Sequence, residues 1–139
     1  MKEYKWSDLY IGMKHEFVAT FSAEDATSFA TISGDHNPLH TDAQYAQAAG
    51  FQEPVLFGMM TSSLYSQLVG VHLPGKYALL QGIDIDFNAP AFAGEALTVA
   101  GEIVFMNEAY RRFEIKATIR NPSRKLVSKA IIRVGFHVS

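Results

Sequence analysis

The fold is decided by residues 58–70, which read GMMTSSLYSQLVG. Apolar side chains recur at helical spacing through Met60, Leu64 and Leu68, and most of the polar residues between them are small hydroxyls. A helix that is apolar nearly all round is expected to be buried against a large surface. We expect this helix to end at Gly70, because glycine is the commonest residue just beyond a helix C-terminus. The segment is therefore predicted to lie at the centre of the molecule.

Alternating apolar and polar residues follow the helix, which is typical of β-strands with one buried face. Short turns separate the segments, and strands joined by short turns form an antiparallel meander. A long apolar helix followed by such a meander favours an α+β fold with the sheet wrapped around the helix. The predicted strands occupy about 77–87, 97–105, 112–119 and 126–136.

Upstream of the helix, residues 15–21 alternate well enough for a further strand. Ser22 then has the character of an N-cap, and two acidic residues follow it in the first turn, where the helix dipole favours anions. The spacing predicts a helix that runs to about Ser33 and ends at Gly34.

The stretch from Asp35 to His40 is predicted to be a loop, because Pro38 cannot lie in the middle of a regular helix. Thr41 and Gln44 fit a capping box, so a short helix is expected to follow and to be stopped by a glycine at position 50.

Length and composition describe one ordinary globular domain spanning 1–139. The hydrophobic fraction is 48%, the charged fraction 19% and the net charge −2. This balance gives no reason to expect nucleic acid or an anionic membrane as a partner. The chain begins without the apolar run of a signal peptide and contains no stretch of transmembrane length, so the cytoplasm is the expected compartment.

Asp35 and His40 lie on either side of Pro38 and have the clearest chemical potential in the sequence. A carboxylate and an imidazole on a rigid loop form a proton-transfer pair whose properties burial and mutual charge can tune. Either residue alone is more simply explained as a turn cap or a structural histidine. Taken together with Gly58, the pair favours catalysis: His40 exchanges a proton with water while Asp35 orients that water. We treat His36 as structural or solvent-facing.

Gly58 lies where the central helix begins, and a glycine there lets a ligand approach the backbone closely. Its N–H would lie at the positive end of the helix dipole, a suitable place to stabilise a carbonyl oxygen that becomes an enolate. Alone, Gly58 is better explained by a tight turn. Among the helix hydroxyls, Ser66 is the one we expect near a substrate, and we interpret the others as small packing residues.

Two other kinds of site are not expected. His36 and His40 have the spacing of zinc ligands on a helix, but Pro38 breaks the helix that this spacing requires, and no third ligand is evident. The chain has no cysteine, so disulfides, thiolate nucleophiles and zinc–thiolate sites are excluded. No Gly-x-Ser-x-Gly elbow is present.

Two segments together resemble the MaoC-like dehydratases, typified by the (R)-specific enoyl-CoA hydratases. Residues 34–40, Gly-Asp-His-Asn-Pro-Leu-His, satisfy the hydratase motif of that family throughout. Residues 57–60, Phe-Gly-Met-Met, correspond to the His-Gly-Met-Leu segment that opens the family's central helix. Segments 73–75 and 87–94 also look like family landmarks, so the resemblance covers most of the chain.

The resemblance implies a hot-dog fold and a homodimer, or a higher homo-oligomer, in which two sheets join edge to edge with the site near the interface. It also implies reversible syn addition of water to a trans-2-enoyl thioester, giving an (R)-3-hydroxyacyl thioester. No separate cofactor is implied, since coenzyme A or the phosphopantetheine of an acyl carrier protein is part of the substrate.

Carried over by position, Asp35 and His40 are the acid–base pair. The Gly58 amide binds the thioester carbonyl, and Ser66 matches a serine that the family keeps near the site. Asn37, from the motif, is expected beside the substrate.

Phe57 is the departure from the family pattern, because it replaces a histidine. Any hydrogen bond made by that histidine is absent here, and Phe57 is expected instead to form an apolar wall of the substrate site. We do not expect the replacement to abolish hydration.

Two alternative functions remain. A hot-dog thioesterase typically uses a carboxylate on the central helix, and residues 59–69 contain none. A non-catalytic thioester-binding module is disfavoured by the intact Asp35 and His40 and weakly favoured by Phe57. The sequence leaves open the acyl chain length and the choice between coenzyme A and carrier protein. It does not rank the basic residues that could meet phosphates, which include Arg111, Arg112, Arg124 and Lys125.

Overall fold

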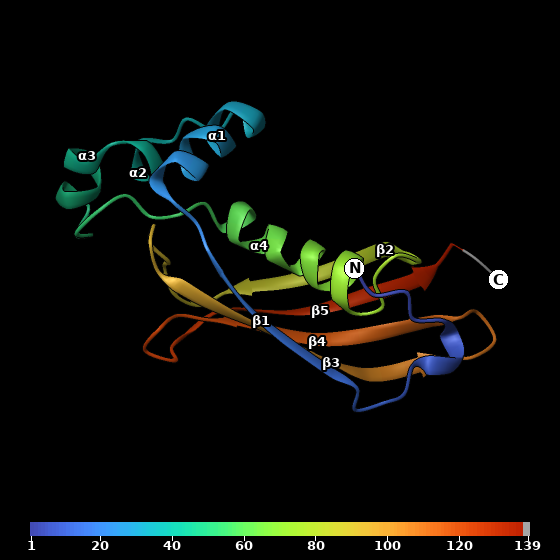
Figure 1. Cartoon of the computed structure of the whole chain (residues 1–139). Coiled ribbons are helices and arrows are strands. Elements are labelled where there is room, and N and C mark those ends of the chain that lie inside the picture. Colours follow the sequence, from blue (N-terminus) through green and yellow to red (C-terminus); the bar gives the residue numbers. More distant parts are fainter. Residues whose placement is uncertain (138–139) are drawn as a thin grey trace.

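The computed structural model describes residues 1–137, in which a five-stranded antiparallel sheet is covered on one face by a central helix (Figure 1). The helix α4 spans Gly58–Gln67 and continues without a break as the π-helical turn η2, Leu68–His72. The α+β architecture expected from the sequence is confirmed. The strands are β1 (Lys14–Thr20), β2 (Ala78–Phe87), β3 (Ala96–Asn107), β4 (Arg112–Arg120) and β5 (Leu126–Phe136).

The order of strands across the sheet is β1-β3-β4-β5-β2. Strands β3, β4 and β5 form the expected meander, but β2 pairs with β5 and lies at the far edge from β1. The prediction that all four later strands follow one another across the sheet was therefore wrong for β2. Alternation in β2 correctly marks Ile83 and Ile85 as members of the inner face, but it carries no information about which strand lies beside them.

The core lies between α4 and the inner face of the sheet. Leu64 and Leu68 are 4% and 0% exposed, and alternate residues of β3, β4 and β5 are buried beneath them. Gly101 of β3 lets the helix come close, since a Cβ built there would lie 2.7 Å from Cδ2 of Leu68. Tyr65 and Ser128 share a buried hydrogen bond of 2.7 Å that joins α4 to β5.

A group of short helices forms an overhang at one end of the sheet, beyond the start of α4 (Figure 1). The overhang consists of α1 (Ala23–Ser33), α2 (Pro38–Thr41) and α3 (Ala43–Ala48). A short 3-10 turn, η1 (Trp6–Asp8), precedes β1. The predicted limits of α1 are confirmed: the Ser22 hydroxyl accepts from the Asp25 N–H, and Gly34 ends the helix with φ of 73°.

The structure corrects the prediction that the whole of residues 35–40 is a loop. Pro38 is the first residue of α2, with the Asn37 side chain as its cap. Proline is tolerated at that position because its missing N–H would have no partner in the first turn. Pro38 therefore starts a helix, and His40 projects from a helical turn.

Two other predicted limits were wrong. The cap of α3 is Asp42, whose carboxylate accepts from the Tyr45 N–H, and not Thr41. The central helix does not end at Gly70, because the π-helical turn carries it on to His72.

Within residues 1–137 no helix combines the length and apolar character needed to cross a bilayer.

Candidate active site

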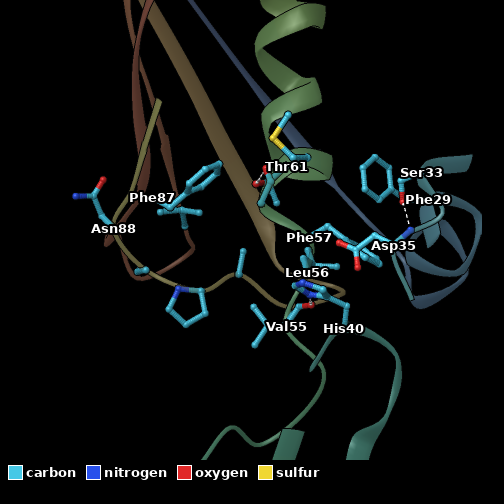
Figure 2. A pocket seen from close by; sticks show the side chains of 16 residues that line it. Phe29, Ser33, Asp35, His40, Val55, Leu56, Phe57, Thr61, Phe87 and Asn88 are labelled. Carbon is cyan, nitrogen blue, oxygen red and sulfur yellow. Dashed lines mark hydrogen bonds between the residues drawn. The ribbon is translucent and has the colours of Figure 1, made fainter. Parts of the chain in front are cut away.

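A cavity of about 750 Å³ lies at the N-terminal end of α4, between the overhang and the segment that follows β2 (Figure 2). Both members of the predicted catalytic pair line it, as do Phe57 and Gly58. The remaining lining residues are mostly apolar: Phe29, Val55, Leu56, Met59, Phe87, Ala89, Pro90, Ala91 and Val127, with Ser33, Thr61 and Asn88 as the polar exceptions. This composition suits a substrate with an apolar chain and one polar reacting group.

Asp35 is held by a tight turn that follows the end of α1. Its N–H donates to the Ser33 hydroxyl at 3.1 Å, and its Oδ1 accepts from the Asn37 N–H at 3.0 Å. An Asp that bonds the backbone two residues later is an Asx-turn, which fixes the direction of the side chain. The turn uses Oδ1, and no side-chain or backbone group in the described part of the chain donates to Oδ2.

His40 is held by a backbone carbonyl. Its Nδ1 lies 2.7 Å from the carbonyl oxygen of Val55. Since a carbonyl oxygen can only accept, Nδ1 carries the hydrogen, and in the neutral imidazole Nε2 then presents a lone pair. The Val55 N–H in turn donates to the Leu39 carbonyl at 3.1 Å, so two hydrogen bonds at Val55 join α2 to the segment before α4. His40 is thereby prepared to act as a base through Nε2.

Phe57 packs against the same imidazole. The two rings are stacked with centroids 4.3 Å apart and planes inclined by 28°. Figure 2 shows Asp35, His40 and Phe57 toward one side of the pocket and Phe87 and Asn88 toward the other.

The start of α4 supplies hydrogen-bond donors. The Phe57 carbonyl accepts from the N–H groups of Met60 and Thr61, whereas the Gly58 N–H belongs to the first turn and has no acceptor within the helix. The Gly58 carbonyl accepts from the hydroxyls of Thr61 at 3.0 Å and Ser62 at 2.7 Å, which fixes the peptide that follows. A free N–H at the positive end of a helix dipole can stabilise a developing negative charge.

Glycine at position 58 also lets the Phe87 side chain come close to the start of the helix. A Cβ built there would lie 2.8 Å from Cε1 of Phe87, at the end of β2. The close approach predicted for Gly58 is thus made by a side chain of the protein, and the cavity borders the same point.

Two residues predicted beside the substrate lie outside the lining of this cavity. Ser66 is two turns along α4, on the exposed side of the helix. Asn37 caps α2, its Oδ1 accepting from the Leu39 N–H at 3.0 Å. Their substrate contacts stay predictions, whereas the capping role of Asn37 is a finding.

Most of the other lining residues were not singled out as part of the site from the sequence, among them Phe29, Ser33, Thr61 and Asn88. Thr61 follows Gly58 by three residues, and this spacing could have placed its hydroxyl over the first turn. Phe29 and Asn88 come from α1 and from the segment after β2, and no local pattern connects these to residues 35–58.

No group of three or more His, Asp or Glu side chains in the described part of the chain is arranged to hold a metal ion.

The family model for the MaoC like domain matches residues 10–124, a span that includes the overhang, the central helix and most of the sheet. The chain belongs to the MaoC-like family. An (R)-specific enoyl-CoA hydratase from Aeromonas caviae is 36% identical to this MaoC-like chain over 100 residues, covering 72% of the chain and 75% of that protein.

A mitochondrial 3-hydroxyacyl-[acyl-carrier-protein] dehydratase from Arabidopsis thaliana is 30% identical to this MaoC-like chain over 96 residues. The match covers 69% of the chain and 57% of the plant protein. The solved structure of an (R)-hydratase from A. caviae involved in PHA biosynthesis superposes with a TM-score of 0.88 at 30% identity, covering 92% of this chain and 97% of that one. The predicted hot-dog fold is confirmed by this likeness. The relatives named are hydro-lyases.

Proposed function

We propose that this chain catalyses the reversible (R)-specific hydration of trans-2-enoyl thioesters. The observation that carries the proposal is that Asp35, His40 and the start of α4 line one cavity. A proton-transfer pair is thus brought to the same space as a free N–H at a helix N-terminus, which are the two requirements for adding water to a double bond conjugated with a carbonyl group.

In the proposed reaction, Nε2 of His40 removes a proton from a water molecule that Asp35 orients. The water oxygen forms a bond to C3 of the enoyl group, and the π-electron pair moves through C2 onto the thioester oxygen. The Gly58 N–H stabilises the resulting enolate. The proton held by His40 is then delivered to C2, with Asp35 as the relay, so that the elements of water have been added across the double bond. Dehydration follows the same steps in reverse.

The thioester carrier is either coenzyme A or an acyl carrier protein. Both kinds of substrate are named among the relatives. The apolar walls of the cavity support an acyl chain as the part of the substrate that enters it. We propose that residues 1–139 act as one domain in this reaction.

We infer further that the chain forms a homodimer through the edge of β2. The two edge strands differ: β2 exposes Leu79, Leu80 and Phe87, whereas the exposed large apolar residue of β1 is Val18. Apolar edge strands pair with another chain unless they are protected. Because Phe87 also lines the cavity, a partner on this edge would lie beside the site. A monomeric mass in light scattering at micromolar concentration would contradict this inference.

The function is tested by mixing the protein with crotonyl-CoA and longer 2-enoyl-CoAs and following the absorbance of the conjugated thioester. We expect loss of absorbance and, in a chiral assay, the (R)-alcohol. Asp35→Asn keeps the oxygen that accepts from the Asn37 N–H, and His40→Asn keeps a donor near the Val55 carbonyl. Each variant is expected to lower the rate by about 10²–10⁴-fold, the usual contribution of general acid–base catalysis.

The matched control is His36→Ala, an exposed histidine in the same turn, which is expected to retain activity. Full activity in either Asp35→Asn or His40→Asn would contradict the mechanism. Release of free thiol without hydration would replace the proposed function by a thioesterase. If no CoA ester reacts, the enoyl group is presented on an acyl carrier protein, and hydration there decides between an enzyme and a binding module.

A further inference from the structure

The Phe57 side chain offers the substrate little surface, although it borders the cavity. It is 2% exposed. Its ring contacts His40 at 4.3 Å and Phe29 at 4.9 Å between centroids, so aromatic neighbours from α1 and α2 surround it. A side chain that is almost fully covered by protein cannot be the main wall of an acyl site. The low exposure of Phe57 therefore disfavours the expectation from the sequence that this side chain forms such a wall.

Phe57 contacts the catalytic imidazole at its face. The Val55 carbonyl holds one edge of the His40 ring through Nδ1, but a hydrogen bond to a carbonyl tolerates a range of angles and does not by itself fix the tilt of the ring plane. A flat ring stacked at 28° restrains that tilt and thereby directs Nε2. The hydrogen bond and the stack together specify both the tautomer and the plane of the base.

The backbone of Phe57 also fixes the other reactive group of the site. Phe57 is the N-cap of α4, with extended backbone angles of −60° and 130°, and its carbonyl closes the first turn. The next residue, Gly58, carries the free N–H. One residue thus contacts the base with its ring and begins the helix that supplies the oxyanion donor.

We propose that Phe57 is a positioning residue that sets His40 and the Gly58 N–H at a fixed separation by stacking on the imidazole. The proposal rests on the proposed hydratase function for its kinetic consequence. Stacking replaces the polar side chain that the family pattern has at this position. Since reacting atoms must be aligned closely, loss of the stack is expected to slow the chemical step without weakening substrate binding.

The test compares Phe57→Leu, which fills much of the volume without a flat ring, with Phe57→His, which restores a flat ring. We expect Phe57→Leu to lower kcat by about 10–100-fold at unchanged KM, since a misplacement of about 1 Å can cost 10²-fold. The loss should be equal for crotonyl-CoA and for longer enoyl-CoAs. Phe57→His is expected to recover most of the lost kcat.

The alternative role predicts a different pattern. If Phe57 were an acyl wall, Phe57→Leu would change KM by an amount that grows with chain length and would leave kcat with crotonyl-CoA intact. Either that pattern or an unchanged kcat overturns the proposal. Phe29→Leu removes a neighbouring aromatic ring but leaves the stack on His40, so its effect on kcat should be smaller than that of Phe57→Leu.

An NMR measurement without substrate separates this proposal from the function on which it rests. The ring protons of His40 lie over the face of Phe57 and should resonate upfield of an exposed histidine such as His36. The shift should vanish in Phe57→Leu and remain in Phe29→Leu. An unshifted His40 in the natural chain overturns the proposal even if hydration is observed. If the His40 resonances are shifted but the protein hydrates no thioester, the contact between Phe57 and His40 is confirmed and the proposed hydratase function is rejected.

Discussion

The central helix with its sheet and the overhang differ in how they are held together. Five residues of α4 are buried, namely Met60, Thr61, Ser62, Leu64 and Tyr65, whereas α2 buries none and α1 and α3 bury one alanine each. The overhang keeps its shape through caps, an Asx-turn and backbone hydrogen bonds. Free energy of folding is therefore concentrated in the helix and sheet, and the acid–base pair lies in the part that contributes least to it.

From this separation we expect that the stability and the chemistry of the molecule can be changed independently. The cavity lies where the two regions meet, because α4 brings the Gly58 N–H from the core and the overhang brings Asp35 and His40. Substitutions in the helix and sheet should change the free energy of unfolding, and substitutions in the overhang should change kcat.

Leu68→Ala should have the largest effect on stability. Leu68 is fully buried against β3, and truncating such a leucine typically lowers the free energy of unfolding by about 2–5 kcal/mol. The kcat of the folded fraction should stay close to the natural value, because Leu68 does not line the cavity. Urea denaturation and kcat at low temperature measure the two quantities. Gln67→Ala, on the exposed side of the same helix, is the control, and a lower kcat at unchanged stability in Leu68→Ala would refute the separation.

Tyr65→Phe should change how stability depends on pH. Burial raises the pKa of Tyr65 to about 12, although the hydrogen bond with Ser128 acts in the opposite direction. The unfolded chain titrates near pH 10, so the folded state retains the proton longer. The natural protein therefore loses stability as the pH rises from about 10 to 12, by about 2–3 kcal/mol for a shift of about two units.

At neutral pH, Tyr65→Phe should be less stable by about 1 kcal/mol, because it loses the hydrogen bond to Ser128. The variant lacks the alkaline loss, so the difference should shrink above pH 10 and change sign before pH 12. Thermal denaturation at several pH values measures this, and the other tyrosines cancel in the difference. If the difference in stability between the two proteins stays constant with pH, burial does not raise the pKa of Tyr65.

Asn37→Ala should have the smallest effect on global stability and act locally on the overhang. The lost cap of α2 is worth about 0.5–2 kcal/mol, and α2 has no buried side chain to compensate for it. Amide hydrogen exchange should accelerate in residues 38–41 and stay unchanged in residues 60–67, with a lower kcat. Asn37→Asp keeps the accepting oxygen and should behave like the natural chain. Equal acceleration in both segments would mean that overhang and core unfold as one unit.

The elements with local signals could be predicted from the sequence. The apolar period of α4, the cap at Ser22 and the stop at Gly34 identify two helices, and alternation identifies the strands. The partner of β2 could not be predicted, since pairing is decided between segments far apart in sequence. The start of α2 was missed because Pro38 excludes a helix interior and allows a helix start, and the residues around it do not separate the two.

The candidate site could be predicted where its residues are close in sequence. Asp35, His40 and Gly58 were identified and do line one cavity. Phe29 and Asn88 were missed because they reach the cavity through the packing of α1 and the course of the chain after β2. The contact of Phe57 with His40 was also missed, since a substitution in a motif shows that a side chain differs and does not show what it touches.

The hydrogen bond from His40 to the Val55 carbonyl has a consequence for how the sequence can vary. Every amino acid has a backbone carbonyl, so no single substitution at position 55 removes the acceptor. The orientation of the base is thus buffered against mutation at the residue that maintains it. The side chain at position 55 still lines the cavity, but the role of its carbonyl would leave little trace in a comparison of related sequences.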